Sequence, residues 1–242
     1  MKLSPDKYQA LADMYMQAGL GDMFSGSIHN LSNHVQILDM QLNMLNSLLE
    51  KDPEDKSSRI FEKVDCLSRE LSGLRSSLRC NSEYSYYTRK EPAQVNVDQY
   101  IKWFLAFRRN CLYFKHKILC RPQVERRDIN LDLPPFYLTI CLDQGIRNAL
   151  EEFRIKAPEQ DNDLVFHAGP AGTGGAVFLI ISKTRLQDID PWEVGSSSKP
   201  GHLGMGLPLV EHLCRRLGWQ VTLQANEEDT RFQLQIPGMK SR

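Results

Sequence analysis

The chain has 242 residues, and its 30 Lys and Arg balance its 30 Asp and Glu to a formal net charge of zero. This balance argues against a nucleic-acid binder or a polybasic membrane-surface protein, because the affinity of both depends on net positive charge. With 41% hydrophobic and 25% charged residues, the composition is that of an ordinary globular protein. The length suffices for one large domain or two modest domains, each with its own core.

No apolar run approaches the ~18 residues that a membrane helix needs, and the longest run, 177–181, has the length of a strand. Asp6 and Asp13 lie where a signal peptide would have its apolar stretch, so we expect a cytoplasmic protein without a membrane segment. The six cysteines are scattered and form no CxxC pair, which predicts reduced thiols rather than disulfides or a zinc site.

Residues 1–80 have the pattern of a helical hairpin. Apolar residues recur at alternating steps of three and four, as in a coiled-coil seam, at Ile28, Leu31, Val35, Leu38, Leu42, Leu45 and Leu49. Pro53, in the segment 52–55, ends this helix, and a second seam runs from Ile60 to Leu78. A two-helix hairpin cannot bury such a seam alone, so we expect a homodimer with a four-helix bundle. The alternative is a hairpin that packs on the second half of its own chain.

The rest of the chain predicts a linker and a second domain. Residues 81–95 are polar, contain tyrosines and Pro92, and are typical of a linker. Within 96–242 we expect helices over 98–113, after Pro135 through Phe153, and over 208–217. Strands are expected around 117–120, 128–133, 164–168, 176–182, 220–225 and 231–236. Helices on one face of a mixed sheet form an α+β sandwich.

A glycine cluster at 169–175 lies between two of the predicted strands. It lacks the Gly-Lys-Ser/Thr ending of a phosphate-binding loop that opens a helix. The cluster therefore predicts a hairpin turn rather than a phosphate site.

The segment from Leu20 to Asn33 combines two glycines, one histidine and two asparagines at short spacing. It reads Leu20-Gly-Asp-Met-Phe-Ser-Gly-Ser-Ile-His29-Asn30-Leu-Ser-Asn33. It resembles the phosphoacceptor segment of two-component sensor histidine kinases, in the branch of nitrogen- and dicarboxylate-sensing kinases. Without this surrounding pattern, a solvated surface histidine would be the simpler interpretation of His29.

Two later segments resemble motifs of the same family, in the family's order and spacing. Residues 142–153, with Gln144 and Asn148, are similar to the asparagine box of its ATP-binding domain. Residues 191–210 are similar to the F-box and the glycine-rich lid, with Lys199, Gly204, Gly206 and Leu207 at the matching positions. The fold that the resemblance implies is a dimerisation and phosphotransfer hairpin followed by a Bergerat-type, Hsp90-like α/β sandwich.

The resemblance implies roles for these residues. His29 would carry the phosphoryl group, and the helical period supports this, because His29 follows the seam residue Ile28 and is turned ~100° from the buried stripe. Asn33, four residues on, shares that face and would position a hydrolytic water. Asn148 would coordinate Mg²⁺ through its carbonyl oxygen, a suitable hard ligand. The alternative for Asn148 is a capping or surface amide.

The resemblance also implies how an ATP molecule would be held. Gly204, Gly206 and Leu207 would bring backbone N–H groups to the phosphates before a helix N-terminus. Lys199 would add a phosphate contact, and Gln144 stands where the family has another asparagine. The alternative for the glycines is a plain loop.

Two family features are missing. The family has an Asp-x-Gly-x-Gly box after the strand 177–181, where this chain has Ser182-Lys-Thr184-Arg185. Losing the aspartate's hydrogen bond to adenine costs about 1–3 kcal/mol. Asp188 or Asp190 could substitute, but their spacing does not match the family geometry. Asn30 stands where such kinases have an acidic residue, and losing a general base slows a reaction about 10²–10⁴-fold. We therefore expect slow or absent autophosphorylation.

The sequence predicts a soluble histidine kinase core that acts through phospho-His29 on a response-regulator receiver domain. It would work as a phosphotransferase, a phosphatase or a weak kinase, with ATP and Mg²⁺ binding weakened or lost. One alternative is an ATP-dependent histidine autokinase with an atypical adenine pocket. Another, from a different class, is a non-catalytic dimeric adaptor.

Overall fold

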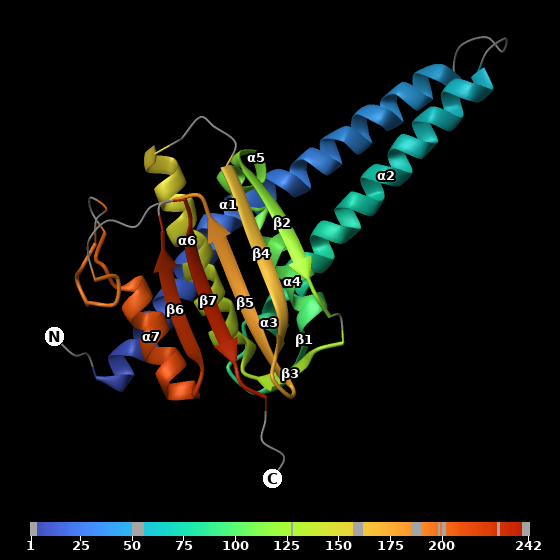
Figure 1. The fold of residues 1–242 in the computed structure, drawn as a ribbon. Helices are drawn as coiled ribbons and strands as arrows, with labels where there is room; N and C mark the ends of the chain where they lie inside the picture. Colours follow the sequence, from blue (N-terminus) through green and yellow to red (C-terminus); the bar gives the residue numbers. More distant parts are fainter. Residues whose placement is uncertain are drawn as a thin grey trace.

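The computed structural model describes residues 4–49, 56–126, 128–156, 162–184, 190–197, 199, 202–226 and 228–238. It combines a long helical hairpin with a sandwich of helices and strands (Figure 1). The hairpin consists of α1 (Pro5–Leu49) and α2 (Lys56–Ser82). The expected α+β fold and long N-terminal rod are therefore confirmed. Pro53 itself lies outside the described residues.

The seam residues of the hairpin form two sets with different burial. Leu31, Leu38 and Leu45 of α1 are half-buried, as are Leu67 and Leu74 of α2. A second apolar set, at heptad spacing, is exposed and comprises Ile28, Val35, Leu42 and Leu49 on α1 and Val64, Leu71 and Leu78 on α2. The distal part of the hairpin projects beyond the sandwich (Figure 1). One hairpin thus buries only half of its seam.

The segment that was predicted to be a linker, 81–95, contains secondary structure. It holds α3 (Tyr84–Tyr87) and most of β1 (Ala93–Asn96). Tyr87 is buried and its ring lies 4.5 Å from that of Trp103, centroid to centroid. Tyr84 packs on Phe107 at 5.0 Å. These aromatic rings attach the end of α2 to the sandwich, because each buries a large apolar area there.

The sandwich is built on a five-stranded mixed sheet. Its order is β2-β4-β5-β7-β6, with β2 parallel to β4 and the other neighbours antiparallel. The strands are β2 (Ile118–Val124), β4 (Asn162–Ala171), β5 (Gly175–Ser182), β6 (Gln220–Ala225) and β7 (Thr230–Ile236). A separate pair joins β1 to β3 (Asn130–Leu133). The predicted glycine turn joins β4 to β5, with φ of +63° at Gly172 and +75° at Gly174.

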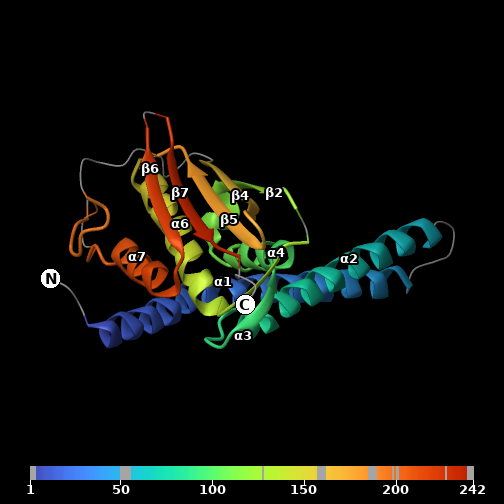
Figure 2. The same cartoon turned by 60° about the horizontal axis from the view of Figure 1, so that its bottom comes forward.

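Helices cover one face of this sheet. They are α4 (Val97–Arg108), α5 (Leu112–Lys117), α6 (Pro135–Lys156) and α7 (Gly206–Leu217). The single helix predicted over 98–113 is wrong, because the chain leaves the helix at 109–111 and begins α5 at Leu112. Fully buried Phe104, Leu142, Phe166 and Phe178 lie between helices and sheet. Figure 2 shows α4, α6 and α7 between the sheet and α1.

The first half of α1 packs on the sandwich of its own chain. The Tyr8 ring stacks on His212 of α7, with centroids 3.8 Å apart. Tyr137 of α6 donates a hydrogen bond to Gln9 Oε1 at 2.9 Å, and Asp13 pairs with Lys90 at 2.8 Å. The alternative of intrachain packing therefore applies to this half of α1, whereas residues 28–49 run on into the projecting hairpin. Within the described ranges, no helix is long and apolar enough to cross a membrane.

Candidate functional site

His29 lies on the exposed side of α1, close to where this helix leaves the sandwich. Its Nε2 is 3.2 Å from Nδ2 of Asn33, one turn further along. With the Asn33 amide as donor, Nε2 is the acceptor and the imidazole proton lies on Nδ1. The nitrogen nearest Asn33 then keeps the lone pair that a nucleophile needs.

The neighbouring Asn30 faces the sandwich instead of solvent. Its Nδ2 donates to Oδ1 of Asn110 at 3.2 Å, and its Oδ1 accepts from Nζ of Lys115 at 2.6 Å. Gly26, one turn earlier, lies against the same corner, where an added Cβ would clash with the Asn110 carbonyl oxygen. Sequence reasoning missed Asn110 and Lys115, because neither belongs to a motif and both are about 80 residues from their partner.

A cavity opens between α6, the N-terminus of α7 and the sheet. The sequence-predicted residues Gln144, Asn148, Lys199, Gly204, Gly206 and Leu207 all line it. The structure thus brings together residues from two motifs that are about 50 positions apart. Tyr15 of α1 also lines the cavity, and sequence reasoning missed it. Burial and the nearby Glu151 carboxylate raise the pKa of the Tyr15 phenol, so it is a neutral donor at pH 7.

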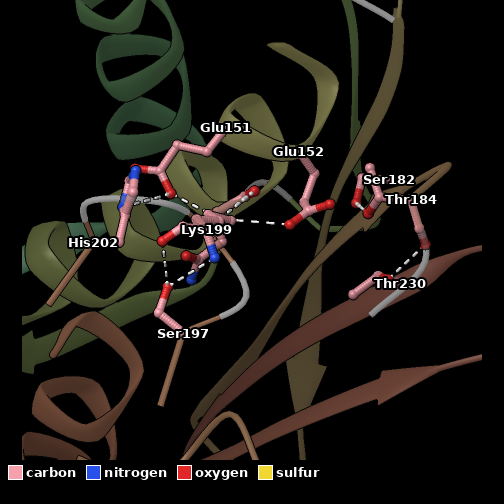
Figure 3. Close-up of polar contacts among 9 residues, drawn as sticks. Glu151, Glu152, Ser182, Thr184, Ser197, Lys199, His202 and Thr230 are labelled. Atoms are coloured by element: carbon pink, nitrogen blue, oxygen red, sulfur yellow. Dashed lines mark hydrogen bonds and ion pairs between the residues drawn. The ribbon is translucent and has the colours of Figure 1, made fainter. Parts of the chain in front are cut away.

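Lys199 lies among acidic groups at one end of this cavity (Figure 3). Its Nζ is 2.7 Å from Glu151 and 3.9 Å from Glu152, and it donates to the Asn148 backbone oxygen at 3.3 Å. The side chain is only 10% exposed. His202 faces the same Glu151 carboxylate at 3.8 Å. An anionic ligand could therefore pair with Lys199 only if the ion pairs of this lysine with Glu151 and Glu152 were broken.

The lid glycines have local reasons to be glycine. Gly204 has φ of +59°, and a Cβ there would lie 2.5 Å from the Ser196 carbonyl oxygen. At Gly206 a Cβ would lie 2.5 Å from Oε1 of Gln144, so the α7 N-terminus and this buried amide approach closely. Asn148 Nδ2 is buried and finds no hydrogen-bond partner among the described residues. These features fit a cradle for the charged end of a ligand such as Mg-ATP.

A second group of polar residues in the cavity, on the side away from Lys199, consists of three hydroxyls (Figure 3). Ser182 Oγ and Thr184 Oγ1 are 2.9 Å apart, and Thr230 Oγ1 donates to the Thr184 carbonyl oxygen at 2.7 Å. Both Ser182 and Thr184 are buried. Within the described part of the chain, hydroxyls therefore stand where the resemblance implies a carboxylate for adenine. A hydroxyl is a weaker acceptor than a carboxylate.

Of the two aspartates considered as substitutes for that carboxylate, the structure describes only Asp190. Asp190 Oδ1 accepts a hydrogen bond from the Trp192 backbone at 2.9 Å, which commits it to the turn 190–193. Asp188 lies outside the described residues. The described residues thus fit the phosphates and metal of a nucleotide better than its base.

The cavity and His29 are well separated in this conformation. Tyr15, at the cavity, and His29 are fourteen positions apart on the continuous helix α1. At 1.5 Å per residue this is about 21 Å along the axis. A phosphoryl group in the cavity therefore lies far from the imidazole of the same chain.

Comparison with known proteins relates this geometry to solved structures. No family model matches the sequence, and no curated protein sequence matches it. A nucleotide-free catalytic domain of histidine kinase ThkA superposes with a TM-score of 0.53 at 13% identity, over 61% of this chain and 98% of that one. A second nucleotide-free form of ThkA gives a TM-score of 0.52 at 14% identity, over 61% and 96%.

A longer match includes the hairpin. Full-length ShkA in complex with AMPPNP superposes with a TM-score of 0.53 at 15% identity, over 99% of this chain and 47% of that one. The chain thus spans about half the length of ShkA. Such a likeness at low identity establishes architecture, and both helices of the hairpin and the five-stranded sandwich take part in it. The chain has the fold of a histidine kinase core.

Proposed function

We propose that the protein transfers phosphoryl groups in two-component signalling, with His29 as the carrier. The single observation that supports this is the exposed His29 imidazole, whose Nε2 faces the Asn33 amide within a kinase-type hairpin. In the step, the Nε2 lone pair attacks the phosphorus of a receiver-domain aspartyl phosphate. The N–P bond forms, the P–O bond breaks, and the aspartate leaves as a carboxylate with both electrons. The reverse step returns the phosphoryl group.

Asn33 has a second role in this proposal. Its amide donates to Nε2 and so favours the tautomer in which Nε2 carries the lone pair, and after transfer it donates to a phosphoryl oxygen or to a water. A water held there would hydrolyse the partner's aspartyl phosphate, which gives phosphatase activity. Asn30 supplies no base, because an amide does not take up a proton at neutral pH.

We also propose that the working unit is a homodimer. Exposed apolar residues at heptad spacing on both α1 and α2 form two uncovered stripes on one hairpin. A second hairpin with the same stripes covers both at once, as in a four-helix bundle. His29 lies off these stripes, so that it stays accessible in the dimer.

The experiment mixes the protein with a panel of receiver domains phosphorylated by ³²P-labelled acetyl phosphate. We expect either label on the protein, stable to alkali and labile to acid, or faster loss of label from one receiver. His29→Ala should abolish both effects. His167→Ala, on strand β4, is the matched control and should leave both unchanged. Equal activity of His29→Ala and the wild-type protein would exclude this function.

A second candidate, an ATP-dependent autokinase, is favoured by Nδ2 of Asn148 in the cavity, which is buried and has no hydrogen-bond partner within the described part of the chain. Bound Mg-ATP would supply a transferable γ-phosphoryl group. Asn148 would hold the metal through its side-chain carbonyl oxygen after a rotation of the amide. Gly204 and Gly206 would leave room for the phosphates. Lys199 would leave its ion pair with Glu151 and contact the phosphates. The 21 Å estimate for the same chain then requires movement of the sandwich or delivery from the partner protomer.

Titration calorimetry with Mg-AMPPNP decides between the two candidates. Binding that Asn148→Ala abolishes, together with γ-³²P label on His29, would support the autokinase. We expect no label from ATP, because Asn30 is no base and Ser182, Thr184 and Thr230 bind adenine weakly. Label from a phosphorylated receiver without label from ATP would support the carrier alone.

A further inference from the structure

The ammonium group of Lys115 reaches the helical turn that carries His29. It donates a 2.6 Å hydrogen bond to Oδ1 of Asn30, the residue directly after His29. Asn30 and His29 are consecutive residues of α1, so the cation contacts the helical turn that also carries the imidazole. Lys115 and His29 are both exposed.

The fold holds Lys115 in this place. The Asn110 side chain accepts from Asn30 at 3.2 Å, and the Asn110 backbone packs against Gly26, where no Cβ fits. Asn110 and Lys115 flank the start of α5, and the preceding helix is fixed to α2 by the Trp103 indole, which donates to the Cys80 carbonyl oxygen at 2.9 Å. Helix α5 is therefore attached at the level of His29.

The hydrogen-bond partner of Lys115 at this turn is a neutral side chain. Among the described residues it makes no ion pair with a carboxylate. Its acceptor, Oδ1 of Asn30, belongs to an amide, whereas a carboxylate at this position would pair with the ammonium and offset its charge. Asparagine at position 30, where the resemblance implies an acidic residue, thus removes a base from this turn. It also leaves the Lys115 ammonium without a carboxylate partner among the described residues.

We propose that Lys115 binds the phosphoryl group during transfer to and from Nε2 of His29, and that Asn30 is the neutral residue that holds this lysine in place. This inference rests on the proposed phosphotransfer function. The phosphoryl group is dianionic in the donor, and an ammonium beside the attacking nitrogen stabilises it through a charge-assisted hydrogen bond. The sandwich then contributes to phosphotransfer through α5, independently of any nucleotide.

The first test uses phosphoramidate, a small phosphoryl donor that needs no receiver domain. Its P–N bond breaks as the bond to Nε2 of His29 forms, and ammonia leaves. We expect Lys115→Ala to slow phosphorylation of His29 at saturating donor about tenfold, whereas Lys115→Arg restores most of the rate. Lys102→Ala, which removes a lysine from α4, is the charge-matched control and should retain the wild-type rate.

The Asn30→Asp variant distinguishes two explanations of Asn30, as the residue that holds Lys115 or only as a missing base. The two explanations predict different changes in the rate of phosphorylation by phosphoramidate. An aspartate would pair with Lys115 and cancel its charge, so we expect slower phosphorylation by phosphoramidate, with unchanged thermal stability. If residue 30 matters only as a missing base, the aspartate would leave this rate unchanged or raise it. That result, or a wild-type rate in Lys115→Ala, would overturn the inference about Lys115.

The outcomes also separate this inference from the proposed function. If wild-type protein and Lys115→Ala are labelled on His29 at equal rates, Lys115 has no role in the transfer, and the carrier function still stands. Absence of any label on wild-type His29, from phosphoramidate and from receivers, overturns both. An effect of Lys115→Ala with receivers alone, through a raised KM, would assign the lysine to receiver docking and also overturn the inference.

Discussion

At the residue scale, two glycines of α1 differ in what surrounds them. A Cβ on Gly26 would clash with the backbone of Asn110, whereas a Cβ on Gly21 meets no described atom within 4 Å. Backbone cannot move aside as a flexible side chain can, so helix α1 must separate from the α4–α5 corner in a Gly26 variant. The close approach that puts Asn30 next to Lys115 thus depends on the absence of a Cβ at Gly26.

Gly26→Ala should therefore lower the free energy of unfolding by about 1–3 kcal/mol, the range for overpacked sites. Gly21→Ala, in the same helix, should raise it by up to about 1 kcal/mol, because alanine has the higher helix propensity. Urea denaturation followed by circular dichroism measures both. Equal effects of the two substitutions would show that α1 does not pack on Asn110 in solution.

A second residue-scale prediction concerns His212, which stacks on Tyr8. Burial first, and then Arg216 and Arg215, lower the pKa of this imidazole in the folded protein. The unfolded chain therefore binds the proton more tightly, and this contribution to stability is present above about pH 6.5 and is lost as the pH falls. Replacing His212 by Phe keeps the stack and removes the titration.

Thermal melting of the wild-type protein and of His212→Phe between pH 8 and pH 5 provides the measurement. The difference between their melting temperatures should shift in favour of the variant as the pH falls through the range of histidine titration. A constant difference over this range would contradict a lowered pKa of the half-buried His212 imidazole. The carboxylates that titrate at lower pH are common to both proteins and cancel in the comparison.

At the element scale, the exposed seam residues decide whether two hairpins associate. Leu42→Glu and Leu71→Glu each place a charge in a stripe that we propose to be buried in a dimer, and we expect each to yield monomers. Asn43→Glu changes a neighbouring exposed polar position of α1 and should leave the dimer intact. Sedimentation velocity distinguishes these states. A wild-type protein that sediments as a monomer would rule out the proposed bundle.

The elements also show what local sequence patterns can and cannot predict. The heptad spacing predicted the hairpin, and the glycines at 172 and 174 predicted a turn, because both depend on neighbours in sequence. The break between α4 and α5 was missed, since residues 109–111 contain neither glycine nor proline. The packing of the tyrosines at 84 and 87 was missed for another reason, because aromatic rings in a polar segment do not reveal which surface will bury them.

At the scale of the whole molecule, the motifs predicted which residues gather at the cavity but not how α1 lies on the sandwich. Gln144, Asn148 and Lys199 were expected from resemblance, and they line one cavity. The contacts of Tyr8 and Tyr15 with the second half of the chain were not predictable, because no periodicity marks residues 5–24 as a packing surface. The Asn30–Lys115 contact joins residues 85 positions apart and has no local signal.

Helix α1 runs without interruption from the cavity to the imidazole, so a single rigid body joins both places. A small molecule that fills the cavity must accommodate Tyr15, and any rotation of α1 that results also turns His29 relative to α5. Thermodynamic linkage makes this relation reciprocal: if such a ligand alters the phosphorylation equilibrium of His29, phosphorylation alters the ligand's dissociation constant by the same factor.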